Sequence, residues 1–208
     1  MRTKTIIAGF ALVVTSSQAM ATQPYLGAQA GWQDLGIKYT ERETGFPNLV
    51  TDGYSASGLA FGVVGGIRLP TDTGYVAVEF NYGVSGSEYE FSFDGDKDTL
   101  ETKSSYGLSL IGGLKIQPKS FIYGRLGYQT TELEGTISVP GWSLSQKETH
   151  NGPRVGLGAE FETGNNVLLR LDWSRTFYSG ENYFSEPGFS IELKPTESLF
   201  QVGAIVTF

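Results

Sequence analysis

Apolar and polar residues alternate with a period of two along much of this chain beyond its first 21 residues. The pattern is clearest in the last eleven residues, SLFQVGAIVTF. One face there carries Phe200, Val202, Ala204, Val206 and Phe208, and the other carries Gln201, Gly203, Ile205 and Thr207. Successive side chains of a β-strand point to opposite faces. The segment therefore predicts a strand with one wholly apolar face.

Eight such strands are expected, over residues 24–38, 58–69, 75–86, 103–116, 121–132, 150–162, 167–178 and 198–208. Three connections are short and rich in turn residues, at 70–74, 117–120 and 163–166. Four are long, at 39–57, 87–102, 133–149 and 179–197. Short and long connections alternate, as in bacterial outer-membrane barrels with periplasmic turns and extracellular loops. The predicted fold is all-β, an eight-stranded antiparallel up-and-down transmembrane β-barrel with both termini in the periplasm.

The N-terminal segment has the three regions of a secretory signal peptide. Arg2 and Lys4 supply positive charge, residues 6–14 form an apolar run, and Ala19-Met20-Ala21 offers a cleavage site between small residues. The apolar run is about half the roughly 20 residues that a transmembrane helix needs. We expect residues 1–21 to be removed and residues 22–208 to form a single domain, the barrel with its four long loops.

Composition narrows the function classes. Without residues 1–21, the chain has 13 basic and 22 acidic residues, a net charge of −9, which disfavours nucleic-acid binding. Cysteine is absent, so disulfides do not hold the fold together. Beyond the signal there is no long apolar run, so strands must form any membrane span.

The two faces of the predicted strands differ in chemistry. Apolar residues occupy the outward face, and five aromatic residues fall toward its loop ends, where we expect a belt at the membrane interface: Trp32, Tyr82, Tyr106, Tyr128 and Trp173. Charges alternate with them on the inward face: Arg68, Glu79, Lys115, Arg125, Arg154, Glu160, Arg170 and Asp172. Because side chains fill the interior of an eight-stranded barrel, we expect these opposite charges to pair as an interior network rather than line an open pore.

These features together resemble the small outer-membrane β-barrel family that includes the OmpX/Ail proteins and the transmembrane domain of OmpA. The resemblance covers the signal peptide, eight alternating strands, inward charges such as Arg125 and Glu79, and the terminal Phe208. It implies a Gram-negative outer-membrane location, contact with membrane lipid and lipopolysaccharide, and recognition of the last strand, ending at Phe208, by the barrel-assembly machinery. Members act variously in adhesion, serum resistance, colonisation and virulence, or envelope stability.

Two motifs are candidate sites of chemistry. A lipid A deacylase of this architecture uses a His-x-Ser motif with a nearby Glu, but His150 is followed by Asn151-Gly152, and Glu160 lies ten residues along the same strand. Residues 94–98 (DGDKD) begin like a calcium loop, but position 105, where the bidentate Glu is expected, is Ser. They are better explained as the turn of a hairpin. We predict no catalytic residues, no metal site and no cofactor.

The long loops are the more plausible interaction surface. Four aromatic residues there are candidate contacts, namely Trp142, Tyr183, Phe184 and Phe189. Aromatic side chains bury much area at low entropic cost, although packing of loop against loop explains them equally well. The expected function is non-enzymatic surface interaction, such as adhesion to a host surface or matrix ligand. An envelope-structural role, a lipid A-modifying enzyme and a narrow solute conduit remain as alternatives.

Overall fold

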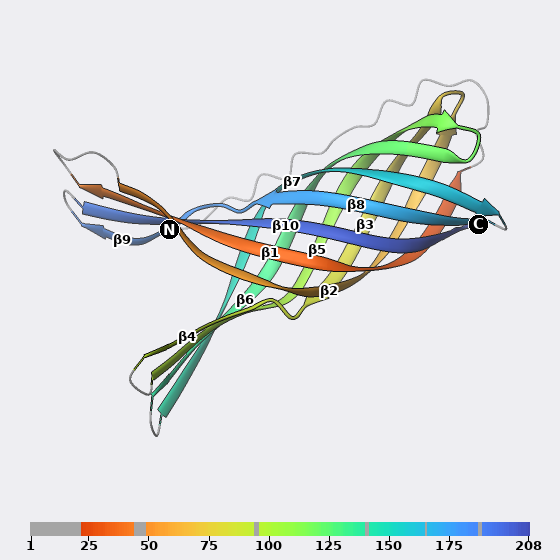
Figure 1. Ribbon diagram of the computed structural model, residues 1–208. Coiled ribbons are helices and arrows are strands. Elements are labelled where there is room, and N and C mark those ends of the chain that lie inside the picture. The colour runs from red at the N-terminus through yellow and green to blue at the C-terminus, as the bar shows by residue number, and fades with distance from the viewer. Residues whose placement is uncertain (1–21, 44–48, 94–95, 140–141, 165, 187–188) are drawn as a thin grey trace.

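The computed structural model describes residues 22–43, 49–93, 96–139, 142–164, 166–186 and 189–208 (Figure 1). The predicted signal peptide, residues 1–21, lies outside the described residues. The described chain folds into ten strands: β1 Gln23–Glu43, β2 Leu49–Thr71, β3 Gly74–Ser85, β4 Glu88–Phe93, β5 Asp96–Gln117, β6 Ser120–Val139, β7 Trp142–Gly164, β8 Val167–Phe177, β9 Glu181–Glu186 and β10 Phe189–Thr207. In this part of the chain no helix is both long and apolar enough to cross a membrane.

Eight strands form a closed antiparallel ring in the order β1, β2, β3, β5, β6, β7, β8 and β10. The ring closes because β1 pairs with β2 on one side and with β10 on the other. The backbone N–H of Phe208 extends this last ladder by donating to the carbonyl of Pro24. The predicted fold class, an eight-stranded antiparallel barrel, is confirmed.

The strands are longer than the sequence pattern predicts. Most of the residues expected in the four long loops belong to strands that continue the barrel wall, and β4 and β9 are additional short strands within two of those loops. The outward face is apolar only along part of each strand, so the alternating pattern ends with that part. Backbone hydrogen bonds do not depend on the polarity of this face, and the strands therefore continue further. The sequence pattern therefore underestimates the length of the strands.

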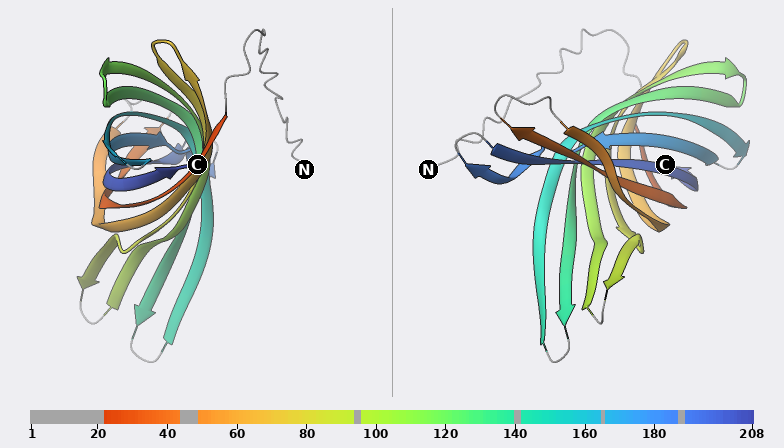
Figure 2. Two further views of the ribbon diagram at one scale, coloured as in Figure 1. Left: turned by 90° about the vertical axis from the view of Figure 1, so that its right-hand side faces the viewer. Right: turned by 60° about the vertical axis from the view of Figure 1, so that its left-hand side comes forward.

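The continued strands make two sheet extensions at one end of the barrel, which diverge from each other (Figures 1 and 2). The first extension consists of β4 with residues 96–103 of β5, 131–139 of β6 and 142–149 of β7, paired in that order. The second consists of residues 49–56 of β2, 37–43 of β1, 189–196 of β10 and β9. The three tight turns lie at the opposite end of the barrel.

Tyrosine side chains fill the interior by packing against glycines of neighbouring strands. Tyr75 lies over Gly113 and Tyr123 lies over Gly158, so closely that an added Cβ at either glycine would overlap the ring. Both tyrosines belong to a buried cluster with Tyr25, Val64, Ala77, Ile111, Leu168 and Ile205. Glycine at these two positions leaves the space that the aromatic rings occupy.

This packing predicts unequal effects of the same substitution at two adjacent glycines. Gly113→Val should destabilise the barrel by about 1–3 kcal/mol, because its side chain competes with the Tyr75 ring. Gly112→Val is the matched control, since a Cβ there has no heavy atom within 4 Å and points outward. Urea unfolding of the refolded protein in lipid vesicles measures both. Equal stability of the two variants would contradict the assigned packing.

Candidate functional site

Glu79 is the centre of the buried interior charge network. Its carboxylate accepts hydrogen bonds from Tyr25 Oη at 2.8 Å and Arg125 Nη2 at 2.7 Å, and from Arg170. Each of these residues is at most 2% exposed. Because a carboxylate without a partner would be costly in such an interior, the two guanidinium groups and the phenol together stabilise its charge.

Glu160 and Asp172 extend the network around the lumen. Glu160 is bonded by Arg68 Nη2 at 2.6 Å and by Arg170 through Nε at 3.0 Å and Nη2 at 2.7 Å. Asp172 accepts from Tyr123 and lies 3.1 Å from Arg125 Nη2. The interior therefore holds alternating acids and bases that cross from wall to wall.

Arg154 joins this network to a neutral polar layer nearer the two extensions. It donates to Asn81 Oδ1 and Gln129 Oε1, both at 3.2 Å, and to Ser174 Oγ at 2.7 Å. Its Nη2 lies 3.9 Å from Asp172 Oδ1. These side chains are buried, so the middle of the lumen is packed with protein.

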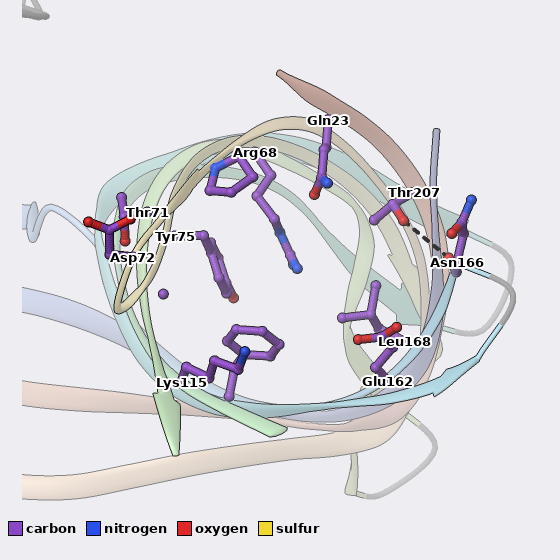
Figure 3. A pocket seen from close by; sticks show the side chains of 13 residues that line it. Gln23, Arg68, Thr71, Asp72, Tyr75, Lys115, Glu162, Asn166, Leu168 and Thr207 are labelled. Atoms are coloured by element: carbon purple, nitrogen blue, oxygen red, sulfur yellow. Dashed lines mark hydrogen bonds between the residues drawn. The ribbon is translucent and has the colours of Figure 1, made fainter. Parts of the chain in front are cut away.

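The structure brings seven of the eight predicted interior charges together: Arg68, Glu79, Arg125, Arg154, Glu160, Arg170 and Asp172. Placing Lys115 among them was wrong, because its side chain is exposed. Lys115 lines a cavity of about 300 Å³ at the end of the barrel with the tight turns (Figure 3). Alternation gave the correct face of β5, but Lys115 is close enough to the open end for water to solvate it.

Sequence reasoning missed an eighth buried charge. Glu197 is 2% exposed and accepts hydrogen bonds from Gln33 Nε2 at 3.0 Å and Tyr178 Oη at 2.7 Å. The sequence pattern predicts a loop that ends at Glu197, yet this residue continues the inward series of Ile205, Gly203, Gln201 and Leu199. A buried apolar cluster is also found at the extension end, formed by Leu35, Ala56, Leu133 and Tyr178.

The five aromatic residues of the predicted belt, Trp32, Tyr82, Tyr106, Tyr128 and Trp173, are all outward and between 42% and 53% exposed. The outward face of β8 continues beyond Trp173 with Arg175, an exposed charge on a surface expected to have none. Its guanidinium lies 5.6 Å from the centre of the Phe177 ring. The sequence already indicated this residue, because it keeps the parity of Leu169, Leu171 and Trp173.

His150 and Glu160 do not form a catalytic pair. The His150 ring packs edge-on against Tyr178, with centroids 6.4 Å apart, and its Nε2 lies 3.7 Å from a Glu148 carboxylate oxygen. Glu160 is bonded instead to Arg68 and Arg170, in the charge network. The placement of these two residues therefore gives no support to a hydrolase centre.

The acidic segment 94–98 falls at a hairpin between β4 and β5. Phe93 pairs with Asp96, which leaves Asp94 and Gly95 as the two connecting residues, and these lie outside the described residues. Across the described ranges, no group of three His, Cys, Asp or Glu side chains is arranged to hold a metal ion. The pairing agrees with the turn interpretation of this segment.

The first extension has two unlike faces. On the outward face, Lys147 Nζ donates to Glu132 Oε1 at 2.9 Å, and this carboxylate raises the pKa of Lys147, so the lysine keeps its charge. Thr136 and Ser145 share a hydrogen bond of 2.6 Å on the same face. The alternation places Trp142 and Leu144 on the opposite face, which continues the lumen wall, and they are 57% and 51% exposed. This strand therefore offers apolar side chains to water.

The other three predicted contacts are described only by the strands to which they belong. Tyr183 belongs to β9, as does Phe184, and Phe189 begins β10, but their side chains lie outside the described part of the structure. Phe208 is 69% exposed at the end of the closing strand. Its role as an assembly signal stays a prediction.

A comparison of the sequence with protein-family models agrees with the residue pattern, the closed ring and the filled lumen. A family model described as the outer membrane protein β-barrel domain matches residues 5–208. The chain belongs to this family. Membership implies a location in the Gram-negative outer membrane. No curated protein sequence matches the chain.

Solved structures similar to this chain include three bacterial outer-membrane proteins. Neisserial surface protein A (NspA) is 16% identical, with 89% of this chain and 97% of that chain covered, and a TM-score of 0.52. Ail of Yersinia pestis is 12% identical, covering 86% and 98%, with a TM-score of 0.39. The N-terminal barrel of Pseudomonas aeruginosa OprF is 15% identical, covering 86% and 99%, with a TM-score of 0.42. The similarity to NspA shows the same barrel architecture.

Removal of the central carboxylate should be strongly destabilising. Glu79→Gln leaves Arg125 and Arg170 buried without a full counter-charge, and we expect a loss of about 3–5 kcal/mol of unfolding free energy. Glu132→Gln removes an exposed partner of Lys147 and should cost about 1 kcal/mol or less. Urea unfolding in vesicles compares the two variants. Similar losses would show that the interior network is not held by charge pairing.

The filled lumen also predicts electrical behaviour. The network side chains cross the interior, and Arg68 and Tyr75 project into the opening at the tight-turn end (Figure 3). Purified protein in a planar lipid bilayer should therefore show no steady single-channel conductance. Reproducible current steps from the wild-type protein would contradict this assignment and favour a solute conduit.

Proposed function

We propose that this protein is a non-enzymatic surface protein whose two extensions face outside the cell and contact a host surface or matrix ligand. Both termini are then periplasmic, and the tight turns face the periplasm. This orientation follows the usual arrangement of outer-membrane barrels, with short periplasmic turns and longer external segments. The closing strand, which ends at Phe208, is proposed as the segment that the assembly machinery recognises.

The exposed strand of residues 142–149 carries the proposal. Every side chain in this segment is exposed, including Trp142 and Leu144, which share one face of the strand with Gln146 and Glu148. In register with them, Val139 lies opposite Trp142 and Ile137 opposite Leu144 on β6. Apolar positions grouped on a supported strand suit protein recognition, because aromatic side chains bury a large area and β-sheet pairing limits their freedom before binding.

The packed lumen supports this reading over the alternatives. A conduit would need space along the barrel axis, where the charge network lies. A deacylase would need His150 beside a nucleophile and an orienting carboxylate, and His150 instead contacts Tyr178. An envelope-structural role needs only the barrel, so loss of the extension surface should leave that role intact.

Adherence of bacteria that display the protein tests this proposal. Trp142→Ala combined with Leu144→Ala should lower attachment to cultured epithelial cells or immobilised matrix protein about tenfold, as expected for loss of a dominant contact. Ser145→Ala is the matched control, because it alters the same strand on its other face. Folding of each variant is checked by its heat-modifiable migration on gels. Unchanged attachment of a folded double variant would rule out this surface.

A further inference from the structure

The interior of the barrel is hollow at the end that carries the three tight turns. The cavity of about 300 Å³ that lies there is at the lower end of the size range of small-molecule sites. Residues from all eight barrel strands line it, including Gln23 of β1, Arg68 of β2 and Thr207 of β10. The cavity is therefore at the opposite end of the barrel from Trp142 and the two extensions.

Two buried side chains at this cavity have donors without partners. Arg68 is 5% exposed, and its guanidinium carbon lies 3.8 Å from the centre of the Tyr75 ring. Its Nη2 donates to Glu160 at 2.6 Å, but its Nε has no hydrogen-bond partner among the described residues. The hydroxyl of Tyr75, which is 3% exposed, has none in that part of the chain either. Because an unpartnered buried donor is costly, both groups favour a ligand that brings acceptor oxygens.

A second cation points into the same space. Lys115 enters from β5 and Arg68 from β2, and the two side chains extend into the opening from different sides of the barrel wall (Figure 3). No ion pair joins Lys115 to a carboxylate within the described ranges. Glu160, the acid bonded to Arg68, also accepts two hydrogen bonds from Arg170, so its charge is already compensated. The cavity therefore favours a negatively charged group.

The rest of the lining favours a carboxylate over a phosphate. Asp72 and Glu162 also border the cavity, so two negative charges would oppose a doubly charged phosphate. Apolar surface comes from Phe121, whose ring packs edge-on against Tyr75 at 5.7 Å between centres, and from buried Leu168. A singly charged carboxylate on a small apolar body, with N–H groups for the two acids, suits this lining. The C-terminal end of a short peptide has all of these features.

We propose that this cavity binds the C-terminal end of a short peptide, with its carboxylate paired to the guanidinium of Arg68 and the ammonium of Lys115. The hydroxyl of Tyr75 donates to the same carboxylate, and the N–H groups of the peptide face Asp72 and Glu162. Only the compartment that supplies the peptide rests on the proposed orientation, which makes it the periplasm. The site itself is independent of adherence.

NMR titration of the refolded barrel, residues 22–208 in detergent micelles, with the dipeptide alanyl-alanine measures this binding. The wild-type protein should show saturable shifts of amide resonances around the cavity. Lys115→Gln should weaken binding about tenfold, as expected for loss of a charge-assisted hydrogen bond. Lys119→Gln makes the same charge change in the adjacent turn, where the side chain is exposed and does not line the cavity. This matched control should bind normally at physiological salt, which screens exposed charges beyond about 8 Å.

Tyr75→Phe separates binding from folding. It removes a hydroxyl that has no partner in the described structure and keeps the ring beside Arg68. Urea unfolding without peptide should therefore match the wild type, whereas the affinity for alanyl-alanine should fall about fivefold, as expected for loss of one hydrogen bond. Arg68→Gln would not separate the two effects, because Arg68 also pairs with Glu160 in the interior network. Lower stability of Tyr75→Phe with unchanged affinity would assign the hydroxyl to the barrel and overturn its role in the site.

Two further ligands test the assigned chemistry. The C-terminal amide of the dipeptide should bind about tenfold more weakly, because it lacks the carboxylate, and inorganic phosphate should not displace alanyl-alanine. The absence of saturable binding by the wild type, equal binding of the amide, displacement by phosphate, or equal weakening by Lys119→Gln would each overturn the site. All of these measurements use purified protein, so a negative adherence result leaves them unaffected.

Discussion

Backbone hydrogen bonding is the constraint on which the rest of this structure depends. A strand in hydrocarbon cannot leave its N–H and C=O groups without partners, so the sheet must close on itself. Closure occurs between β1 and β10, where Tyr25 pairs with Thr207 and the ladder continues to Glu43 and Phe189. The C-terminal strand therefore completes the barrel wall. Its apolar outward face can lie in lipid because the backbone N–H and C=O groups are hydrogen-bonded to the strands on either side.

Closure with eight strands determines what the interior can hold. Buried side chains include four arginines and four acids in the described lumen: Arg68, Arg125, Arg154, Arg170, Glu79, Glu160, Asp172 and Glu197. Their formal charges cancel. The acidic excess of residues 22–208 therefore belongs to residues outside this buried set. The barrel keeps a neutral interior while the chain as a whole is acidic.

Alternation of residues predicted the faces of the strands well and their ends poorly. The parity that places Glu79 and Arg125 inside was readable from the sequence, as was that of Trp173 outside. The end of the apolar pattern marks the end of the lipid-facing surface and not the end of the hydrogen-bonded ladder, so the pattern predicts a loop at Glu197 where the strand continues. Lys115 illustrates a different limit of the pattern. Alternation tells which face of the strand a residue lies on, but not how far that residue lies from the open end of the barrel. The contacts that select individual partners, such as Arg170 between Glu79 and Glu160, depend on strand register across the lumen, which no local pattern contains.

The uninterrupted passage of β5, β6 and β7 from the barrel into the first extension has a mechanical consequence. A pull on the strand near Trp142, directed along its axis, loads many backbone hydrogen bonds between β6 and β7 at once, since the pairing runs from Trp142 down to Phe161. Such bonds resist shear together, whereas bonds at a flexible loop would be peeled apart singly. The extension can thus transmit tension into the barrel wall without first unfolding.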